Sequence, residues 1–160
     1  YGIDRAVAVL RKQGVKNFIV DGGGDLYFAG EKSPGEPWTV GVKHPRRQNQ
    51  IVAELSVRDA AIVSSGDYER FFERNGLRYH HILDLSDGQP ARKSVAVTVR
   101  ASDATFADAI ATALFVLGPM EGLKFVQLYP DVDAAIFSPD GGVHSTSGFK
   151  GAFPTRWDAK

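Results

Sequence analysis

The sequence predicts an α+β fold with a largely antiparallel sheet and helices packed on one face of that sheet. Strand-like segments follow one another through short connections and do not alternate with helices, which favours antiparallel pairing. An Asn75-Gly76 pair between two aromatic-rich runs predicts a hairpin, because both residues tolerate the positive φ angles of a type I′ turn. Two segments with helical periodicity supply the layer that covers the sheet.

The length and the composition of the chain exclude several classes of function and of site. A chain of 160 residues is expected to form one domain, residues 1–160, with a core of its own. Lys+Arg and Asp+Glu are both 19, so the chain lacks the basic excess of a general nucleic-acid binder. The absence of cysteine excludes disulfides, thiolate metal sites and a cysteine nucleophile.

The start of the chain suggests that this sequence is part of a longer protein. The sequence starts at Tyr1, and a helical pattern begins almost at once. No signal peptide is recognised, and no apolar run is expected to reach the ~20 residues of a membrane span. We therefore expect the start to be an internal point of a larger protein.

Periodicity along the first half predicts a helix and a series of strands. Residues 3–13 place Ile3, Val7 and Leu10 on one helical face, and Gly14 is a plausible stop. Apolar or alternating runs then predict strands, which lie at residues 16–21, 25–29, 38–43, 51–57 and 60–64.

The second half is predicted to contain two hairpins and the main helix. The Asn75-Gly76 hairpin spans residues 68–84, and residues 93–100 alternate strictly as a strand. Residues 102–118 then switch to a helical period, with Ser102 or Asp103 as a cap and Gly118-Pro119 as the stop. A short helix over 120–128 and a last hairpin over 132–147 complete the expected elements.

A glycine run, residues 22–24, joins two predicted strands and is flanked by Asp21 and Asp25. Glycine lets backbone N–H groups approach a phosphate closely. No helix follows the run, so it matches neither a P-loop nor a dinucleotide fingerprint. A tight turn and a phosphate cradle both remain open on spacing alone.

The main predicted helix carries a carboxylate and a hydroxyl one turn apart. Asp108 and Thr112 are i,i+4 neighbours, so both side chains project from one face. Such hard oxygen donors suit Mg²⁺, which usually takes few protein ligands together with substrate phosphates. The alternative is that Asp108 sits at the solvent edge and Thr112 bonds back to the helix backbone.

Two adjacent histidines, His80 and His81, lie in a predicted strand. Neighbouring strand residues point to opposite faces, so only one of the two can enter a given site. The alternatives are a proton acceptor near neutral pH, or one core histidine with a hydrogen bond and one that faces solvent. The nearby residues 64–68 offer hydroxyls but lack the elbow motif of a hydrolase, so a polar turn is favoured there.

Six segments, taken in order, resemble the ApbE family of FAD:protein FMN transferases. Each motif is modest alone, but the succession from residue 1 to about 137 is specific. The matching segments are YGIDRA (1–6), VDGGGD (20–25), WTVGVKHPR (38–46), SSGDYERF (64–71), YHHILD with GQP (79–84 and 88–90) and ATFADAIATALFVLG (104–118).

The resemblance implies an α+β protein that binds FAD and uses Mg²⁺. It implies transfer of the FMN moiety to a Ser or Thr hydroxyl of an acceptor protein, with release of AMP. The implied acceptors are subunits of membrane redox complexes on the periplasmic side of a bacterial inner membrane. Membrane association is expected only through an N-terminal lipid anchor outside this chain. The chain itself is expected to correspond to the later half of a family member.

The resemblance also implies a metal site. Asp108 and Thr112 match the family's metal-binding side chains, and Gly2 matches a position whose main-chain carbonyl reaches the metal. Mg²⁺ held there would neutralise charge on the pyrophosphate and orient its phosphates.

Flavin contacts and a base follow in the same way. Arg5 and Leu83 match flavin-contacting positions, and His81 matches a histidine near the flavin pyrophosphate. We expect His81 to accept the proton of the incoming hydroxyl. The resemblance leaves two alternatives open, an FAD pyrophosphatase that yields FMN and AMP, and an FAD-binding fragment without turnover.

Overall fold

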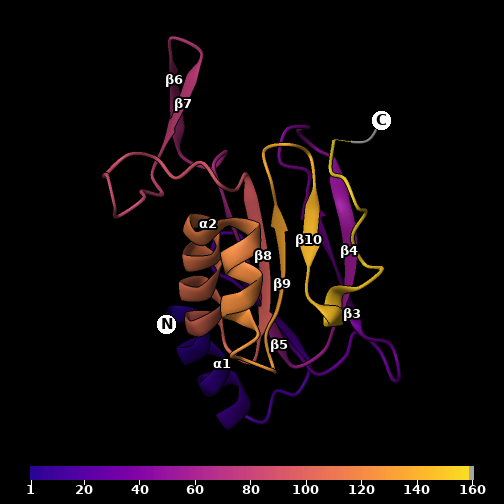
Figure 1. Ribbon diagram of the computed structural model, residues 1–160. Helices are drawn as coiled ribbons and strands as arrows, with labels where there is room; N and C mark the ends of the chain where they lie inside the picture. Colours follow the sequence, from indigo (N-terminus) through magenta and orange to yellow (C-terminus); the bar gives the residue numbers. More distant parts are fainter. Residues whose placement is uncertain (159–160) are drawn as a thin grey trace.

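The computed structural model describes residues 1–158, and its centre is a six-stranded antiparallel sheet in the order β1-β2-β5-β8-β9-β10 (Figure 1). The longest ladder joins β5 to β8, from Ala61 opposite Ala101 to Gly66 opposite Ala96. The predicted α+β class with an antiparallel sheet is therefore confirmed. The strands of this sheet are β1 (Phe18–Asp21), β2 (Leu26–Ala29), β5 (Ala60–Gly66), β8 (Ala96–Ala101), β9 (Asp133–Phe137) and β10 (Val143–Ser145).

Two separate hairpins interrupt the order of the sheet. β3 (Trp38–Lys43) pairs with β4 (Ile51–Val57) between β2 and β5, and β6 (Phe71–Arg74) pairs with β7 (Leu77–His80) between β5 and β8. The second hairpin turns at Asn75 and Gly76, which both have positive φ as predicted. It projects away from the body of the molecule (Figure 1).

Both helices lie on one face of the sheet, as expected. α1 (Gly2–Lys12) packs on β1 and β2, and α2 (Ala104–Val126) packs on β5, β8 and β9. Alternate strand residues such as Tyr27, Val63 and Ile136 point into this layer and are buried there. The helical layer therefore covers the central strands.

The start of α2 is held by two acidic side chains. Asp103 is its N-cap and accepts a hydrogen bond from the Phe106 backbone N–H at 2.8 Å. Asp4 of α1 accepts from the backbone N–H groups of Ala104 and Thr105 at 2.8 and 2.9 Å. The first turn of α1 therefore fixes the position of the first turn of α2.

α2 breaks at Gly118, where φ is +79° and ψ is 177°. The segment after the break folds back beside the first, because a Cβ on Gly122 would lie 3.3 Å from the Leu114 side chain. Both segments are visible side by side in Figure 1. The predicted stop at Gly118-Pro119 and the short helix that follows are thus confirmed.

One expectation about apolar length was wrong. Ala104–Val126 is long and apolar enough, by length and composition, to cross a membrane. The helix is instead interrupted at Gly118 and packs on the sheet, with Ala107, Ala111 and Leu114 fully buried. Its apolar character therefore reflects a core helix covered by strands and by its own second segment.

The opposite face of the sheet is covered by the β3–β4 hairpin and the C-terminal segment. Phe28, Ile62 and Phe137 point to this side and pack with Leu55 and Val57 of β4. The short helix η1 (Ser147–Phe149) adds Phe149, which is buried against the same cluster. The sheet therefore lies between two apolar layers, and the sequence analysis did not foresee this second one.

Several predicted boundaries were displaced. β1 begins at Phe18 and β8 at Ala96, two and three residues later than expected, and β5 extends to Gly66. β5 is longer because Ser65 and Gly66 continue the ladder with Val97 and Ala96. Polar residues at that end are therefore strand residues at the edge of a pocket.

The break in α2 provides a test of the fold. Gly118→Ala should lower the free energy of unfolding by roughly 2 kcal/mol or more, because alanine rarely adopts this backbone conformation. A Cβ there would also lie 2.6 Å from the Lys93 Cβ. Urea denaturation measures the loss.

Gly14→Ala is the matched control, since Gly14 has φ +80° and no atom within 4 Å of an added Cβ. It should lose only about 1 kcal/mol, the cost of a left-handed backbone conformation for an L-residue. A loss at Gly118 that is no larger than the loss at Gly14 would contradict the proposed role of the contact with Lys93.

Candidate functional site

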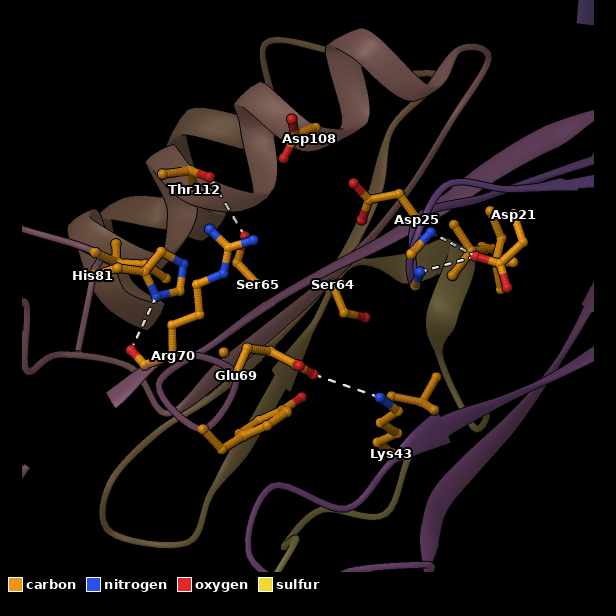
Figure 2. A pocket seen from close by; sticks show the side chains of 18 of the residues that line it. Asp21, Asp25, Lys43, Ser64, Ser65, Glu69, Arg70, His81, Asp108 and Thr112 are labelled. Atoms are coloured by element: carbon orange, nitrogen blue, oxygen red, sulfur yellow. Dashed lines mark hydrogen bonds and ion pairs between the residues drawn. The ribbon is translucent and has the colours of Figure 1, made fainter. Parts of the chain in front are cut away.

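A pocket of about 910 Å³ opens where the first segment of α2, the ends of β3 and β5, the glycine turn and the loops before β6 and after β7 meet. Figure 2 shows the side chains that line it. Its polar lining residues are Asp21, Asp25, Lys43, Ser64, Ser65, Glu69, Arg70, His81, Asp108 and Thr112. Segments far apart in the sequence therefore line one pocket that contains acidic, basic and hydroxyl side chains.

Asp108 and Thr112 both reach this pocket from exposed positions on α2 (Figure 2). Thr112 Oγ1 lies 3.4 Å from Ser65 Oγ of β5, so its hydroxyl faces the strand across the pocket. The helical spacing thus presents a carboxylate and a hydroxyl to the same space. This is the arrangement that the i,i+4 pattern predicted, although the carboxylate is also open to solvent.

Asp25 faces Asp108 across the pocket and was not singled out from the sequence (Figure 2). Burial raises the pKa of the Asp25 carboxyl, and the carboxylates of Asp108 and Asp21 raise it further. Within residues 1–158 its carboxylate has no hydrogen bond or ion pair. Two facing carboxylates without a cation favour the binding of a positive ion between them.

The two histidines separate, but the prediction that both lie in a strand was wrong for one of them: β7 ends at His80, and His81 lies in the bend that follows. His80 is buried, its Nε2 bonds to the Ala91 carbonyl at 3.0 Å, and its Nδ1 accepts from the Ile82 N–H at 3.3 Å. Burial lowers the pKa of His80. Its ring is therefore a neutral core element.

His81 faces the pocket instead. Its Nδ1 lies 3.3 Å from the backbone carbonyl of Arg70. A carbonyl only accepts, so this bond requires the proton on Nδ1 and leaves Nε2 of the neutral ring as an acceptor. The loop that carries Arg70 thus selects the tautomer that a general base needs.

Asp67 anchors that loop. Its buried carboxylate accepts from Arg46 at 2.6 and 2.7 Å and from Arg78 at 3.3 Å. Arg46 follows β3. Arg78 belongs to β7 and also forms an ion pair with Glu73 of β6. One carboxylate therefore joins the end of β5 to both inserted hairpins next to the pocket.

The glycine turn is stabilised by the side chain of Asp21, the residue directly before the glycines. Asp21 Oδ1 accepts from the backbone N–H groups of Gly23 and Gly24, each at 2.9 Å. These two donors are therefore engaged inside the turn. The arrangement favours the tight-turn interpretation over a phosphate cradle.

The remaining predicted site residues lie at or beyond the rim. Leu83 lines the pocket and is 47% exposed, which leaves an apolar surface at its mouth. Gly2 and Arg5 are exposed on α1 and do not line the pocket. The first turn of α1 is nevertheless adjacent, because Ile3 Cδ1 would lie 2.8 Å from a Cβ on Gly22.

The polar turn predicted over residues 64–68 was wrong for Ser65, which is a strand residue of β5 and lines the pocket. The sequence analysis also missed Arg70 and the Lys43–Glu69 ion pair, whose Nζ and Oε1 atoms are 3.5 Å apart. Ser65 and Arg70 stand within the SSGDYERF segment that carried part of the resemblance. A polar turn after a strand signals exposed side chains, but their direction depends on β6, β7 and α2. Local sequence therefore offered no sign that they share a pocket.

The donor chemistry of the pocket fits a hard divalent cation. Among residues 1–158, no group of three His, Cys, Asp or Glu side chains forms a complete metal cage. Mg²⁺ commonly uses one or two carboxylates with water and substrate phosphates, so such a cage is not required. Asp108 and Thr112 supply suitable oxygens, with Asp25 facing them.

Comparisons with known proteins match this chain to one family. The ApbE family model matches residues 1–136. An FAD:protein FMN transferase of Treponema pallidum is 39% identical over 155 residues, and one of Vibrio cholerae is 33% identical over 154 residues. These alignments cover 91% and 94% of this chain but 43% and 46% of those relatives. The chain thus spans less than half the length of the curated relatives it matches.

Solved structures agree with the fold. An ApbE protein from Thermotoga maritima matches with a TM-score of 0.85 and 37% identity. The match covers 96% of this chain and 50% of the Thermotoga maritima chain. The apo form of a flavinyl transferase ApbE from Pseudomonas stutzeri has a TM-score of 0.76 and 33% identity, with coverages of 96% and 48%.

The facing carboxylates yield a prediction. Asp108→Asn should lower the pKa of Asp25 in metal-free buffer, because one like charge is removed. The pKa should stay above its ordinary value, since burial is the larger cause. Carboxyl ¹³C NMR titration measures the change.

Asp21→Asn serves as the comparison, because Asp21 is a weaker cause of the same shift. It should move the Asp25 midpoint less than Asp108→Asn does. An unchanged Asp25 midpoint in Asp108→Asn would show that the two carboxylates do not interact.

Asp67 yields a second prediction. Asp67→Asn should lower the free energy of unfolding by about 2–3 kcal/mol, because it removes the charge that pairs with two partly buried arginines. Chemical denaturation checks this. Asp59→Asn should cost less than about 1 kcal/mol, since the Asp59–Arg11 pair has half-exposed side chains. Equal losses at the two sites would argue against Asp67 as an anchor.

Proposed function

The chain belongs to the ApbE family, and from that premise we propose that it is part of a Mg²⁺-dependent transferase that moves the FMN moiety of FAD to a Ser or Thr hydroxyl of an acceptor protein, releasing AMP. The observation that carries the proposal is the convergence of Asp108, Thr112 and His81 on one pocket. Metal-binding oxygens and a proton acceptor are the groups that such a phosphoryl transfer uses.

Asp108 and Thr112 are the proposed metal ligands, with the main-chain carbonyl of Gly2 as a further donor. A bound Mg²⁺ supplies charge neutralisation and orientation for the pyrophosphate oxygens. The closeness of the first turn of α1 to the glycine turn supports the assignment of Gly2.

His81 is the proposed general base. Because Nδ1–H donates to the Arg70 carbonyl, Nε2 is the atom that accepts the proton of the attacking hydroxyl. The hydroxyl oxygen then bonds to the phosphorus of the FMN half, and the bond from that phosphorus to the bridging oxygen breaks. AMP leaves with the bridging oxygen and its electron pair.

Leu83 and Arg5 are the proposed flavin-contacting residues. The exposed Leu83 at the pocket mouth provides apolar surface for a planar ring. Arg5 lies on α1 outside the pocket, so a contact from it would involve a part of the flavin that extends beyond the pocket.

The acceptor is proposed to be a subunit of a membrane redox complex, met on the periplasmic side of a bacterial inner membrane. Attachment to that membrane would come from a lipid anchor outside this chain. These proposals rest on the family, whose relatives are named FAD:protein FMN transferases.

A second candidate is FAD pyrophosphatase activity, with water in place of the acceptor hydroxyl. The exposure of His81 and Asp108 favours it, because water reaches both side chains. A third is an FAD-binding unit without turnover, since the chain covers 43% of its Treponema pallidum relative.

The test uses the protein at its full natural length with FAD, Mg²⁺ and an acceptor peptide that contains Thr. Covalent FMN on the peptide, seen by mass spectrometry, supports the transferase. Free FMN and AMP without modification support the pyrophosphatase. Bound FAD without cleavage supports the binding unit.

Asp108→Ala should abolish Mg²⁺-dependent turnover while circular dichroism stays unchanged, because the side chain is exposed and makes no packing contact with the core. Asp131→Ala, an exposed acid outside the pocket, should keep normal turnover. Full Mg²⁺-dependent turnover in Asp108→Ala would exclude the metal assignment.

A further inference from the structure

Arg70 is a cation of the pocket that no part of the proposed chemistry yet uses. It follows β5 in the loop anchored by Asp67, and its side chain is exposed and lines the pocket. Figure 2 shows the guanidinium extending into the pocket toward the side where Thr112 and Ser65 lie. Asp25 and Asp108, which also line the pocket, lie farther from Arg70 in the same view.

The guanidinium of Arg70 has no hydrogen bond or ion pair within the part of the chain that the structure describes. The pocket lining contains one other Lys or Arg side chain among the described residues, Lys43, and it pairs with Glu69. A pocket in which the lysine is paired and the arginine is not has a donor group available for an anionic ligand.

We propose that Arg70 binds the diphosphate of the FAD substrate and stabilises the negative charge that leaves with AMP. This inference rests on the proposed function and adds a catalytic residue to it. A guanidinium offers planar N–H donors that match two phosphate oxygens at once.

The step balances with Arg70 as a donor that is itself unchanged. The acceptor oxygen forms the new bond to the phosphorus of the FMN half while its proton passes to His81 Nε2. The bond to the bridging oxygen breaks, and the bridging oxygen carries its electron pair away on AMP. Arg70 donates hydrogen bonds to diphosphate oxygens, on which the negative charge increases during this step.

The loop gives Arg70 two separable contributions. Its backbone carbonyl accepts from His81 Nδ1 and so orients the base, whereas its side chain faces the ligand. Side-chain substitution leaves the carbonyl in place. The diphosphate contact can therefore be tested without removing the hydrogen bond that sets the His81 tautomer.

The experiment compares Arg70→Met and Arg70→Lys with the parent protein at full natural length. Flavin fluorescence measures the affinity for FAD and for riboflavin, which has no phosphate, and AMP release measures turnover. Arg70→Met should bind FAD at least about tenfold more weakly and keep its riboflavin affinity, because a charge-assisted hydrogen bond is lost. Its kcat should fall about 100-fold, and Arg70→Lys should lie between the two.

Arg74→Met is the matched control, since Arg74 is an exposed arginine on β6 that does not line the pocket. It should keep both affinities and kcat. Equal weakening of FAD and riboflavin binding would assign Arg70 to a structural role and overturn the proposal.

Failure of this inference is distinguishable from failure of the proposed function. If the parent protein turns over FAD and Arg70→Met matches it in FAD affinity and kcat, only the proposed role of Arg70 is overturned. Parent protein that binds FAD without cleavage overturns the transferase, while the affinity difference still decides whether Arg70 binds the diphosphate. Parent protein that does not bind FAD contradicts both.

Discussion

The pocket depends on one buried carboxylate more than on any other single group. Asp67 is 8% exposed and accepts hydrogen bonds from Arg46 and Arg78, which come from two hairpins that have no place in the central sheet. A buried charge demands such partners, because an unpaired one is strongly destabilising. The requirement that Asp67 be neutralised therefore holds the β3–β4 and β6–β7 hairpins at the end of β5, where β3 and the loops before β6 and after β7 line the pocket.

The opposite wall is set by the way the two helices meet. Asp4 binds the first N–H groups of α2, where the helix dipole favours an anion, and Gly118 lets the helix fold back after its first segment. These constraints leave Asp108 and Thr112 on the exposed side of a helix whose other side is buried. The resulting pocket holds facing carboxylates and an unpaired arginine within reach of a histidine of defined tautomer.

Patterns of two to four residues predicted most of the fold. Alternation located β3 and β4, a short apolar run located the start of β5, and the Asn75-Gly76 pair located the projecting hairpin. Helical spacing placed Asp108 and Thr112 on one face, whereas His81 reaches the pocket because β7 ends at His80 and the chain bends there. Asp25, Ser65 and Arg70 were missed, because their roles come from segments that lie more than 30 residues away along the chain, α2 above all.

Element types, turns and the spacing of the metal-binding oxygens follow from local rules, since each depends on backbone geometry within a few residues. The covered second face of the sheet, the return of α2 and the assembly of the pocket depend on contacts between distant segments. Burial of charge decides these features, as at Asp67, and so does the close approach of side chains, as between Gly122 and Leu114. Neither leaves a periodic trace in the sequence, because partners in space need have no fixed separation along the chain.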